Sequence, residues 1–210
     1  MSTTTTRQGR GRPPDPDLES RVYRATLALF GEVGWCGFSL DVVARRARVG
    51  KAALYSRWGS KENLIAKALR RGPTAEAPTI DTGSLRGDLI DLALNALDSY
   101  TSGGGLVLLR AQLEAKVYPE VFGPAIDEWQ SEVTARIRPI VLRAVDRGEL
   151  PAGTSPALVL DVVGGTLINH VLWTPANKMP ALAASSARYV EHLVDFVLSA
   201  AGYRALEQDS

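Results

Sequence analysis

Residues 39–64 read SLDVVARRARVGKAALYSRWGSKENL, and the rest of the chain is organised around this stretch. Its first half has one apolar face at helical spacing, made of Leu40, Val43, Ala44 and Ala47. A second short helix begins near Lys51, and Leu54 is its clearest candidate for burial. Ser60 can cap a third helix, because its hydroxyl accepts an unpaired N–H group of the first turn. The stretch therefore predicts two short helices joined by a tight turn, with a third following directly.

The second short helix presents a basic face with small residues, which suits the major groove of DNA. In such motifs the side chains near the helix N-terminus reach base edges, while others hold phosphates. We therefore expect Lys51, Ala52 and Ala53 to lie nearest the bases. Arg45 and Ser56 are further candidates, because they share the same outward face. The alternative from the pattern alone is a solvated helical hairpin in an all-α protein.

The residue types at each position of this stretch are more specific than its pattern of short helices. They resemble the DNA-binding domain of the TetR/AcrR family of bacterial regulators. The matching positions are Ser39, Val43, Ala44, Ala47, Val49, Leu54, Tyr55, Trp58, Lys61 and Leu64. The sequence departs from the family pattern at four positions, where Arg48 replaces the turn glycine, Gly50 the capping serine, Ala52 the second glycine and Arg57 a histidine. The resemblance implies that phosphates are held by Ser39, Tyr55, Arg57 and Lys61.

Charge is distributed unevenly along the 210 residues, although the net charge is only +1. Residues 1–71 contain 14 Lys and Arg and 6 Asp and Glu, a net charge of +8. Residues 72–210 contain 10 and 17, a net charge of −7. A basic front and an acidic rear fit a chain that presents one end to a polyanion.

The first residues form a second basic element. Residues 1–14 are polar, and we expect a flexible basic arm there. Within it, Arg10 and Arg12 flank Gly11 in a segment that resembles the AT-hook, whose arginines enter narrow A·T minor grooves. A solvated basic tail is the alternative. Just ahead of a helix-turn-helix, we predict that the arm reaches a neighbouring minor groove of the same DNA.

The sequence favours a DNA-binding protein over an enzyme. Cys36 is the only cysteine and there are two histidines without metal-ligand spacing, so we predict no disulfide, metal site or cofactor. No nucleophile elbow or paired catalytic carboxylates can be recognised, and we expect no enzymatic activity. The longest apolar run, residues 157–173, contains Asp161 and Asn169, so we read it as a buried helix and expect a cytoplasmic protein without a membrane span.

The chain divides into two helical domains. We predict an all-α fold of about nine helices, with a three-helix DNA-binding head over residues 15–71 and an effector-binding and dimerisation domain over 84–202. Gly and Pro residues between 72 and 83 predict a loop. One long helix is expected from about 119 to 147, and its internal Pro124 and Pro139 should kink or interrupt it.

The second domain should provide an effector pocket and a dimer interface. Aromatic and polar residues on apolar helices are the candidates for contacting a hydrophobic or planar effector: Tyr118, Phe122, Trp129, Asn169, His170 and Trp173. Family resemblance implies a homodimer formed by the last two helices, for which we expect these contacts: Gly164, Gly165, Tyr189, Val190, Leu193, Val194 and Val197.

Together these features predict a ligand-responsive regulator that binds a palindromic double-stranded DNA operator as a homodimer. We expect a repressor that a small hydrophobic effector releases from its operator. An effector-independent architectural DNA-binding protein and a transcriptional activator remain the alternatives. The first of these predicts a second domain without a cavity, whereas a ligand-responsive regulator predicts an enclosed one.

Overall fold

The computed structural model describes residues 17–71 and 79–204, and every regular element within these ranges is a helix. The head contains four helices, which are α1 (Leu18–Val33), α2 (Leu40–Ala47), α3 (Lys51–Trp58) and α4 (Lys61–Arg70). The remaining elements are α5 (Leu85–Thr101), α6 (Gly104–Val117), α7 (Pro119–Asp146), α8 (Pro156–Trp173), the 3-10 helix η1 (Ala176–Lys178), α9 (Met179–Ala184) and α10 (Ser186–Ala200). The predicted all-α fold is confirmed, while the helix count within the described ranges is ten rather than nine because α9 precedes α10. The predicted arm, with Arg10 and Arg12, lies outside the described residues.

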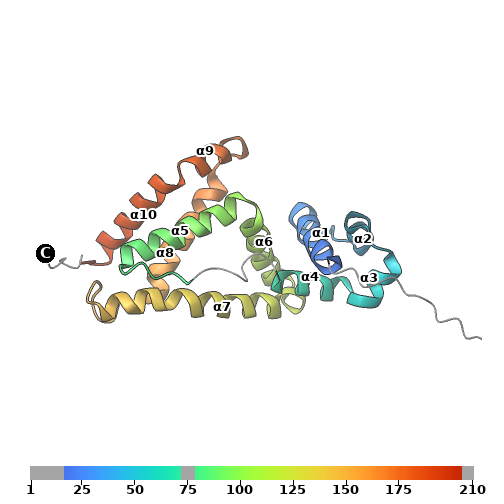
Figure 1. Ribbon diagram of the computed structural model, residues 1–210, viewed down its shortest axis with the longest axis horizontal. Helices are drawn as coiled ribbons and strands as arrows, with labels where there is room; N and C mark the ends of the chain where they lie inside the picture. The colour runs from blue at the N-terminus through green and yellow to red at the C-terminus, as the bar shows by residue number, and fades with distance from the viewer. Residues whose placement is uncertain (1–16, 72–78, 205–210) are drawn as a thin grey trace, which may run out of the picture.

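The molecule is elongated, with the head at one end and the helices α5, α8 and α10 at the other (Figure 1). Helix α7 runs along one side and joins the two ends, since it contacts α4 and α6 near the head and α5 and α8 farther away. Helix α6 stands between the two groups (Figure 1). This arrangement leaves α3 at the end of the molecule away from the second domain.

Helix starts follow the capping signals of the sequence. Ser60, Ser84 and Ser155 each accept a hydrogen bond from a backbone N–H three residues on, at 3.2, 3.1 and 3.3 Å. Ser39 has the extended backbone of a capping residue, but its hydroxyl makes no capping hydrogen bond. These local interactions explain why α4, α5 and α8 begin where the sequence pattern places them.

The expectation that prolines interrupt the long helix is wrong, because α7 is continuous over 28 residues. Pro124 and Pro139 each remove one helical hydrogen bond, which would have gone to the carbonyl group of Glu120 or Ala135. Both of those residues are exposed, so water can satisfy the freed carbonyl groups. The helix can therefore act as one long strut between the two ends of the molecule.

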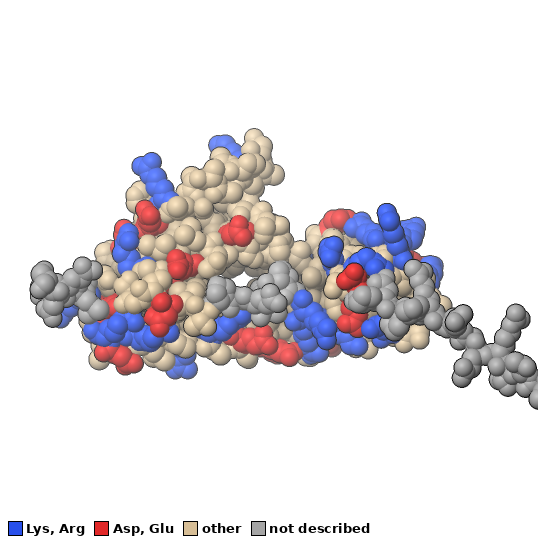
Figure 2. Space-filling view, in the orientation of Figure 1, with Lys and Arg blue, Asp and Glu red and all other residues tan. Residues whose placement is uncertain are grey.

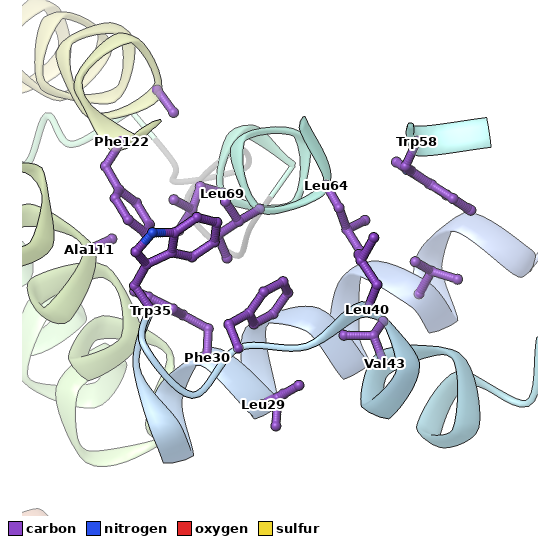
Figure 3. Packing of buried hydrophobic residues seen from close by; sticks show 14 of the residues in the cluster. Leu29, Phe30, Trp35, Leu40, Val43, Trp58, Leu64, Leu69, Ala111 and Phe122 are labelled. Atoms are coloured by element: carbon purple, nitrogen blue, oxygen red, sulfur yellow. The ribbon is translucent and has the colours of Figure 1, made fainter. Parts of the chain in front are cut away.

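One hydrophobic core joins the head to the second domain (Figure 3). Phe122 from the start of α7 packs against Phe30 and Trp35 of the head, with ring centroids 5.4 and 5.3 Å apart. Arg110 on α6 donates a hydrogen bond to the carbonyl group of Gly31 at 2.8 Å. Gly34 ends α1 with a φ of 67°, and a Cβ there would collide with the Arg110 guanidinium, so this position requires glycine. The core thus crosses the predicted boundary between residues 71 and 84.

A second core lies at the far end, where α5 and α8 pack on the last turns of α7 and α10 packs on α5 and α8. Two fully buried carboxylates, Asp88 and Glu149, fix the chain that leads into α5. Glu149 accepts hydrogen bonds from the backbone N–H of Leu85 and from Nε of Arg147, both at 2.6 Å. Asp88 accepts one from Nη2 of Arg143 at 3.2 Å. Each buried charge therefore has an opposite charge and a hydrogen-bond donor beside it.

Replacing Glu149 with alanine should lower the free energy of unfolding by about 3 kcal/mol, because Arg147 and the Leu85 N–H would lose their buried partner. Glu149→Gln keeps an acceptor for that N–H and should cost less. Urea unfolding followed by circular dichroism measures both. Glu132→Ala, at an exposed position on α7, is the control and should stay within about 0.5 kcal/mol of the wild type. An equal effect of Glu149→Ala and Glu132→Ala would show that the buried network contributes nothing.

Candidate nucleic-acid interface

Two buried anchors set the orientation of α3. Leu54 and Trp58, one turn apart, are 0% and 2% exposed. The Trp58 indole N–H donates to the Tyr23 hydroxyl at 3.4 Å, and the two rings meet edge to face. With this side held by the core, the opposite side of α3 faces solvent and exposes Lys51, Ala52, Ala53, Tyr55, Ser56 and Arg57. The structure therefore brings the predicted base-reading and phosphate residues of α3 onto one accessible face.

The turn before α3 keeps its geometry although Arg48 stands in place of glycine. Arg48 has φ 55° and ψ 48°, the left-handed conformation. Its N–H bonds to the carbonyl group of Arg45 at 3.2 Å, and the N–H of Val49 bonds to that of Ala44 at 2.9 Å. These are the two hydrogen bonds of a Schellman helix end, which usually has glycine at the left-handed position. A non-glycine residue there costs about 1–2 kcal/mol of strain.

Intramolecular ion pairs occupy several cations of the head. Lys51 Nζ lies 2.5 Å from Asp41, and Arg57 lies 2.8 Å from Glu19, which also contacts Arg71 at 3.4 Å. These pairs are at least one-third exposed, so they are weak and open to exchange with solvent ions. Both cations can therefore exchange their carboxylate partner for another anion.

Arg46 on α2 is bound to Glu32 of α1. Its guanidinium makes two hydrogen bonds of 2.7 Å to Glu32, and these bonds lower the pKa of the Glu32 carboxyl group. Arg45 is exposed and has no acidic partner within the part of the chain that the structure describes. Lys61 is half-buried, with its ammonium 4.1 Å from the centre of the Trp35 ring, so it would have to turn outward to meet a phosphate. Ser39 is also half-buried.

The structure does not bring the six candidate effector residues into one pocket. Phe122 belongs to the core shared with the head, and Tyr118 lies at the start of α7, where its hydroxyl is 3.3 Å from Cys36 Sγ. Asn169 and Trp173 are exposed on α8. His170 stacks on Tyr189, with the ring centroids 3.9 Å apart. The six residues are therefore scattered, because aromatic residues on helices serve cores and surfaces as well as ligand sites, and their contacts with an effector stay predictions.

Four of the predicted dimer contacts belong to the core of the protomer. Val190, Leu193, Val194 and Val197 are all buried within the single chain, where they pack in the second core. Tyr189 and Gly164 are half-buried, while Gly165 is exposed. The apolar stripe of α10 was expected at an interface, and within the protomer it packs into the second core, because an apolar period does not say what covers it.

The last helices expose large apolar side chains, of which the sequence reading singled out only Trp173. These are Leu158, Val162, Leu172 and Trp173 on α8 and Phe196 on α10, of which Trp173 is 81% and Phe196 71% exposed. By length and mean hydropathy, α8 alone among the described helices could cross a membrane, and 22% of its residues are buried. The available signal was that α8 is apolar nearly all round, so that one of its sides had to remain outside the core.

The fold and the exposed α3 define a helix-turn-helix DNA-binding protein, and comparison with known proteins gives its family. Residues 22–68 match the model described as "Bacterial regulatory proteins, tetR family", and residues 79–197 match "Tetracyclin repressor-like, C-terminal domain". The HTH-type transcriptional regulator AqdR of Rhodococcus erythropolis is 33% identical over 171 residues, which are 80% of this chain and 82% of AqdR. The chain belongs to the TetR family of bacterial transcriptional regulators.

Two further relatives agree with this assignment. The DNA-binding transcriptional repressor TetR of Mycobacteroides abscessus is 30% identical over 150 residues, which are 66% of this chain and 73% of that protein. The solved structure of Salmonella enterica GusR superposes with a TM-score of 0.69 and covers 91% of this chain and 100% of GusR, at 16% identity. That likeness shows the fold. The chain is thus a DNA-binding transcriptional regulator of the kind that joins a helix-turn-helix head to a ligand-binding C-terminal domain.

Two substitutions at one ion pair should change DNA affinity in opposite directions. Arg57→Ala should weaken binding to all sequences alike and reduce the slope of log K against log salt by about 0.9 per subunit. Glu19→Gln frees Arg57 from its intramolecular partner and should strengthen binding by about two- to fivefold. Fluorescence anisotropy with a mixed-sequence duplex over a salt series measures both.

Glu191→Gln on α10 is the matched control for the second substitution, because it removes the same charge at the far end of the molecule (Figure 1). If Glu19→Gln and Glu191→Gln change affinity equally, the pair between Glu19 and Arg57 does not compete with DNA.

Proposed function

We propose that the protein is a cytoplasmic repressor, without enzymatic activity, that binds a near-palindromic operator as a homodimer. A small hydrophobic effector in the second domain would release it. The observation that carries this proposal is the exposed α3 on a head whose core is shared with α7, so that changes in the second domain reach the DNA-reading face. The relative from Mycobacteroides abscessus, which is described as a repressor, supports this sign of regulation.

The exposed face of α8 supports the homodimer. Its outward residues Leu158, Val162, Gly165, Asn169 and Leu172 follow one another at intervals of four, three, four and three. Such a repeat keeps one seam facing a partner helix at a shallow crossing angle. A Cβ added to Gly165 would meet nothing within 4 Å, so a second helix can approach closely at this point. Phe196 on α10 adds a large apolar side chain to the surface available to the partner.

A second copy of the chain fits this face better than lipid does. Asn169 lies within the apolar seam and Asp161 is exposed on the same helix, and such groups are costly in a bilayer. Asp195 beside Phe196 pairs with Arg86 at 2.7 Å, which provides the charged rim expected around an apolar interface. In a two-fold interface a residue can meet its own counterpart, so Asn169 could pair with Asn169 of the other copy and set the register.

Leu158→Asp combined with Phe196→Asp should convert the dimer to a folded monomer, because both residues are exposed in the protomer and an interface would bury the new charges. Sedimentation velocity gives the mass, and circular dichroism checks the fold. Val194→Asp is the contrasting variant, since Val194 is 0% exposed and its replacement should unfold the protein. A wild-type protein that sediments as a folded monomer at micromolar concentration would contradict the proposed dimer.

The middle of α7 supports a site for the effector. One stripe along this helix is buried at both ends, by Phe122 and Ile126 in the first core and by Ile140 and Ala144 in the second. Between them, Trp129 and Val133 continue the same stripe but are only half-buried and belong to neither core. Figure 2 shows the surface hollowed between the middle of α7 and the helices α5 and α6. An architectural DNA-binding protein predicts a fully packed second domain. In such a domain the buried stripe of α7 would continue through Trp129 and Val133.

Trp129 supports a ligand with a hydrogen-bond acceptor. Its indole Nε1 is buried and has no hydrogen-bond partner within the described chain. A buried N–H group without a partner costs about 1–3 kcal/mol, which an acceptor on a bound molecule would recover. We therefore place the effector against Trp129, as a planar apolar molecule with a carbonyl or ether oxygen. A separate open groove on the outer face of α7, about 630 Å³ and lined by residues between Asp127 and Leu142, contains none of the six predicted contacts.

Matched probes can test the role of the Trp129 N–H. Indanone and indane have similar bicyclic shapes, but only indanone has a carbonyl acceptor. Isothermal titration calorimetry should show indanone binding about fivefold more tightly than indane to the wild type, which corresponds to one net hydrogen bond. Trp129→Phe keeps an aromatic ring without the N–H and should remove the difference. Equal affinities of the wild type for the two probes would place the effector away from this N–H group.

A further inference from the structure

The turn between α2 and α3 has a backbone conformation that its residue disfavours. Arg48 is the one non-glycine residue with positive φ among the described residues, whereas glycines occupy the seven other such positions. In this conformation the Cβ of an L-residue crowds its own backbone, which glycine avoids. A strained residue of this kind persists only when something else selects for it.

The fold itself does not benefit from the Arg48 side chain. Both hydrogen bonds of the turn use backbone groups, namely the N–H groups of Arg48 and Val49, so glycine would make them equally well. The guanidinium is exposed and has no ion pair or side-chain hydrogen bond with any residue in the described ranges. Arg46 nearby shows the contrast, because it is tied to Glu32 by two hydrogen bonds. Selection for stability alone would therefore favour glycine at position 48.

The location of Arg48 provides a reason for an arginine. It stands two residues before Gly50, which caps α3, and three before Lys51, which begins that helix. A recognition helix enters the major groove by its N-terminal residues, so the residues just before it pass the phosphates at the groove edge. Arg45 lies on the flank of α2 that also contains Asp41, and Asp41 contacts Lys51. This flank of α2 is therefore next to the start of α3 and adds a second unpaired arginine there.

We propose that Arg48 is an additional phosphate-contacting residue, and that the strained turn persists because an arginine at this position increases affinity for DNA. The inference rests on DNA binding by α3 and names a contact beyond the positions that carry the family resemblance. A phosphate contact holds the protein on DNA without reading sequence, so the effect extends to every duplex. The same residue thus lowers the stability of the free protein and raises its affinity for DNA.

Three substitutions in the full-length protein separate strain from charge. R48G removes both, R48A removes only the charge, and R48K removes neither. The melting temperature should rise by about 2–4 °C in R48G and stay near the wild-type value in the other two. Affinity for a mixed-sequence duplex, followed by fluorescence anisotropy, should fall about eightfold per subunit in R48G and R48A at about 0.1 M salt, and their salt slopes should drop by about 0.9 per subunit. R48K should retain most of the affinity and the slope.

R46Q is the control for net charge, because it removes one arginine from the flank of α2 that Glu32 already occupies. If R48G and R48A lose no more affinity than R46Q, Arg48 is not a phosphate contact and the proposal is overturned. If the melting temperature of R48G is not above that of R48A, glycine relieves no strain at the turn. The part of the proposal that concerns the strained turn then fails. A wild-type protein without salt-dependent DNA binding would instead contradict the function of α3 itself.

Discussion

The insertion of Phe122 between Phe30 and Trp35 is the contact on which the rest of the structure depends. It places the start of α7 inside the core of the head, while the last turns of the same helix belong to the second core. At 1.5 Å per residue, this continuous helix of 28 residues is about 42 Å long and joins the two anchors. Close-packed cores switch between arrangements and do not deform smoothly. A ligand against the middle of α7 would therefore act on the orientation of the whole head.

Some cations of the head would have to exchange an existing carboxylate partner for a DNA phosphate, while others are free of such a partner within the described chain. Lys51 and Arg57 are already paired with Asp41 and Glu19 in the free protein, and both pairs are exposed. If Lys51 and Arg57 contact DNA as expected, binding would replace one weak partner with another, and these two cations would contribute the difference between the two pairings. Arg45 and Arg48 have no such partner in the described chain and can contribute their full attraction to phosphates. Glu19 also contacts Arg71 just after α4, which places one carboxylate between the recognition helix and the connection to the second domain.

Helix α8 has two apolar stripes with different uses. Val159, Val163, Leu167 and Val171 recur every four residues and pack into the second core. The stripe on the other side contains Leu158, Val162 and Leu172 and remains exposed in the protomer. A helix that is apolar on both sides must be covered on both sides. Association of two protomers would cover the second stripe, and a two-fold pair of heads would then match a near-palindromic site on DNA.

The helices of the head could be predicted from the sequence because their signals are local. The apolar period of α2, the capping serine before α4 and the motif of residues 39–64 act within a few positions of each other. Pairings across the chain could not be predicted, since Arg57 meets Glu19 and Phe122 meets Phe30 only when distant segments are brought together. Helix α8 is apolar nearly all round, yet Val163 is 2% and Leu158 65% exposed. The sequence by itself determined the helices of the head and which end of the chain reads DNA. Only the tertiary structure decided which apolar side of each helix faces inward, because that choice depends on what the neighbouring helices offer.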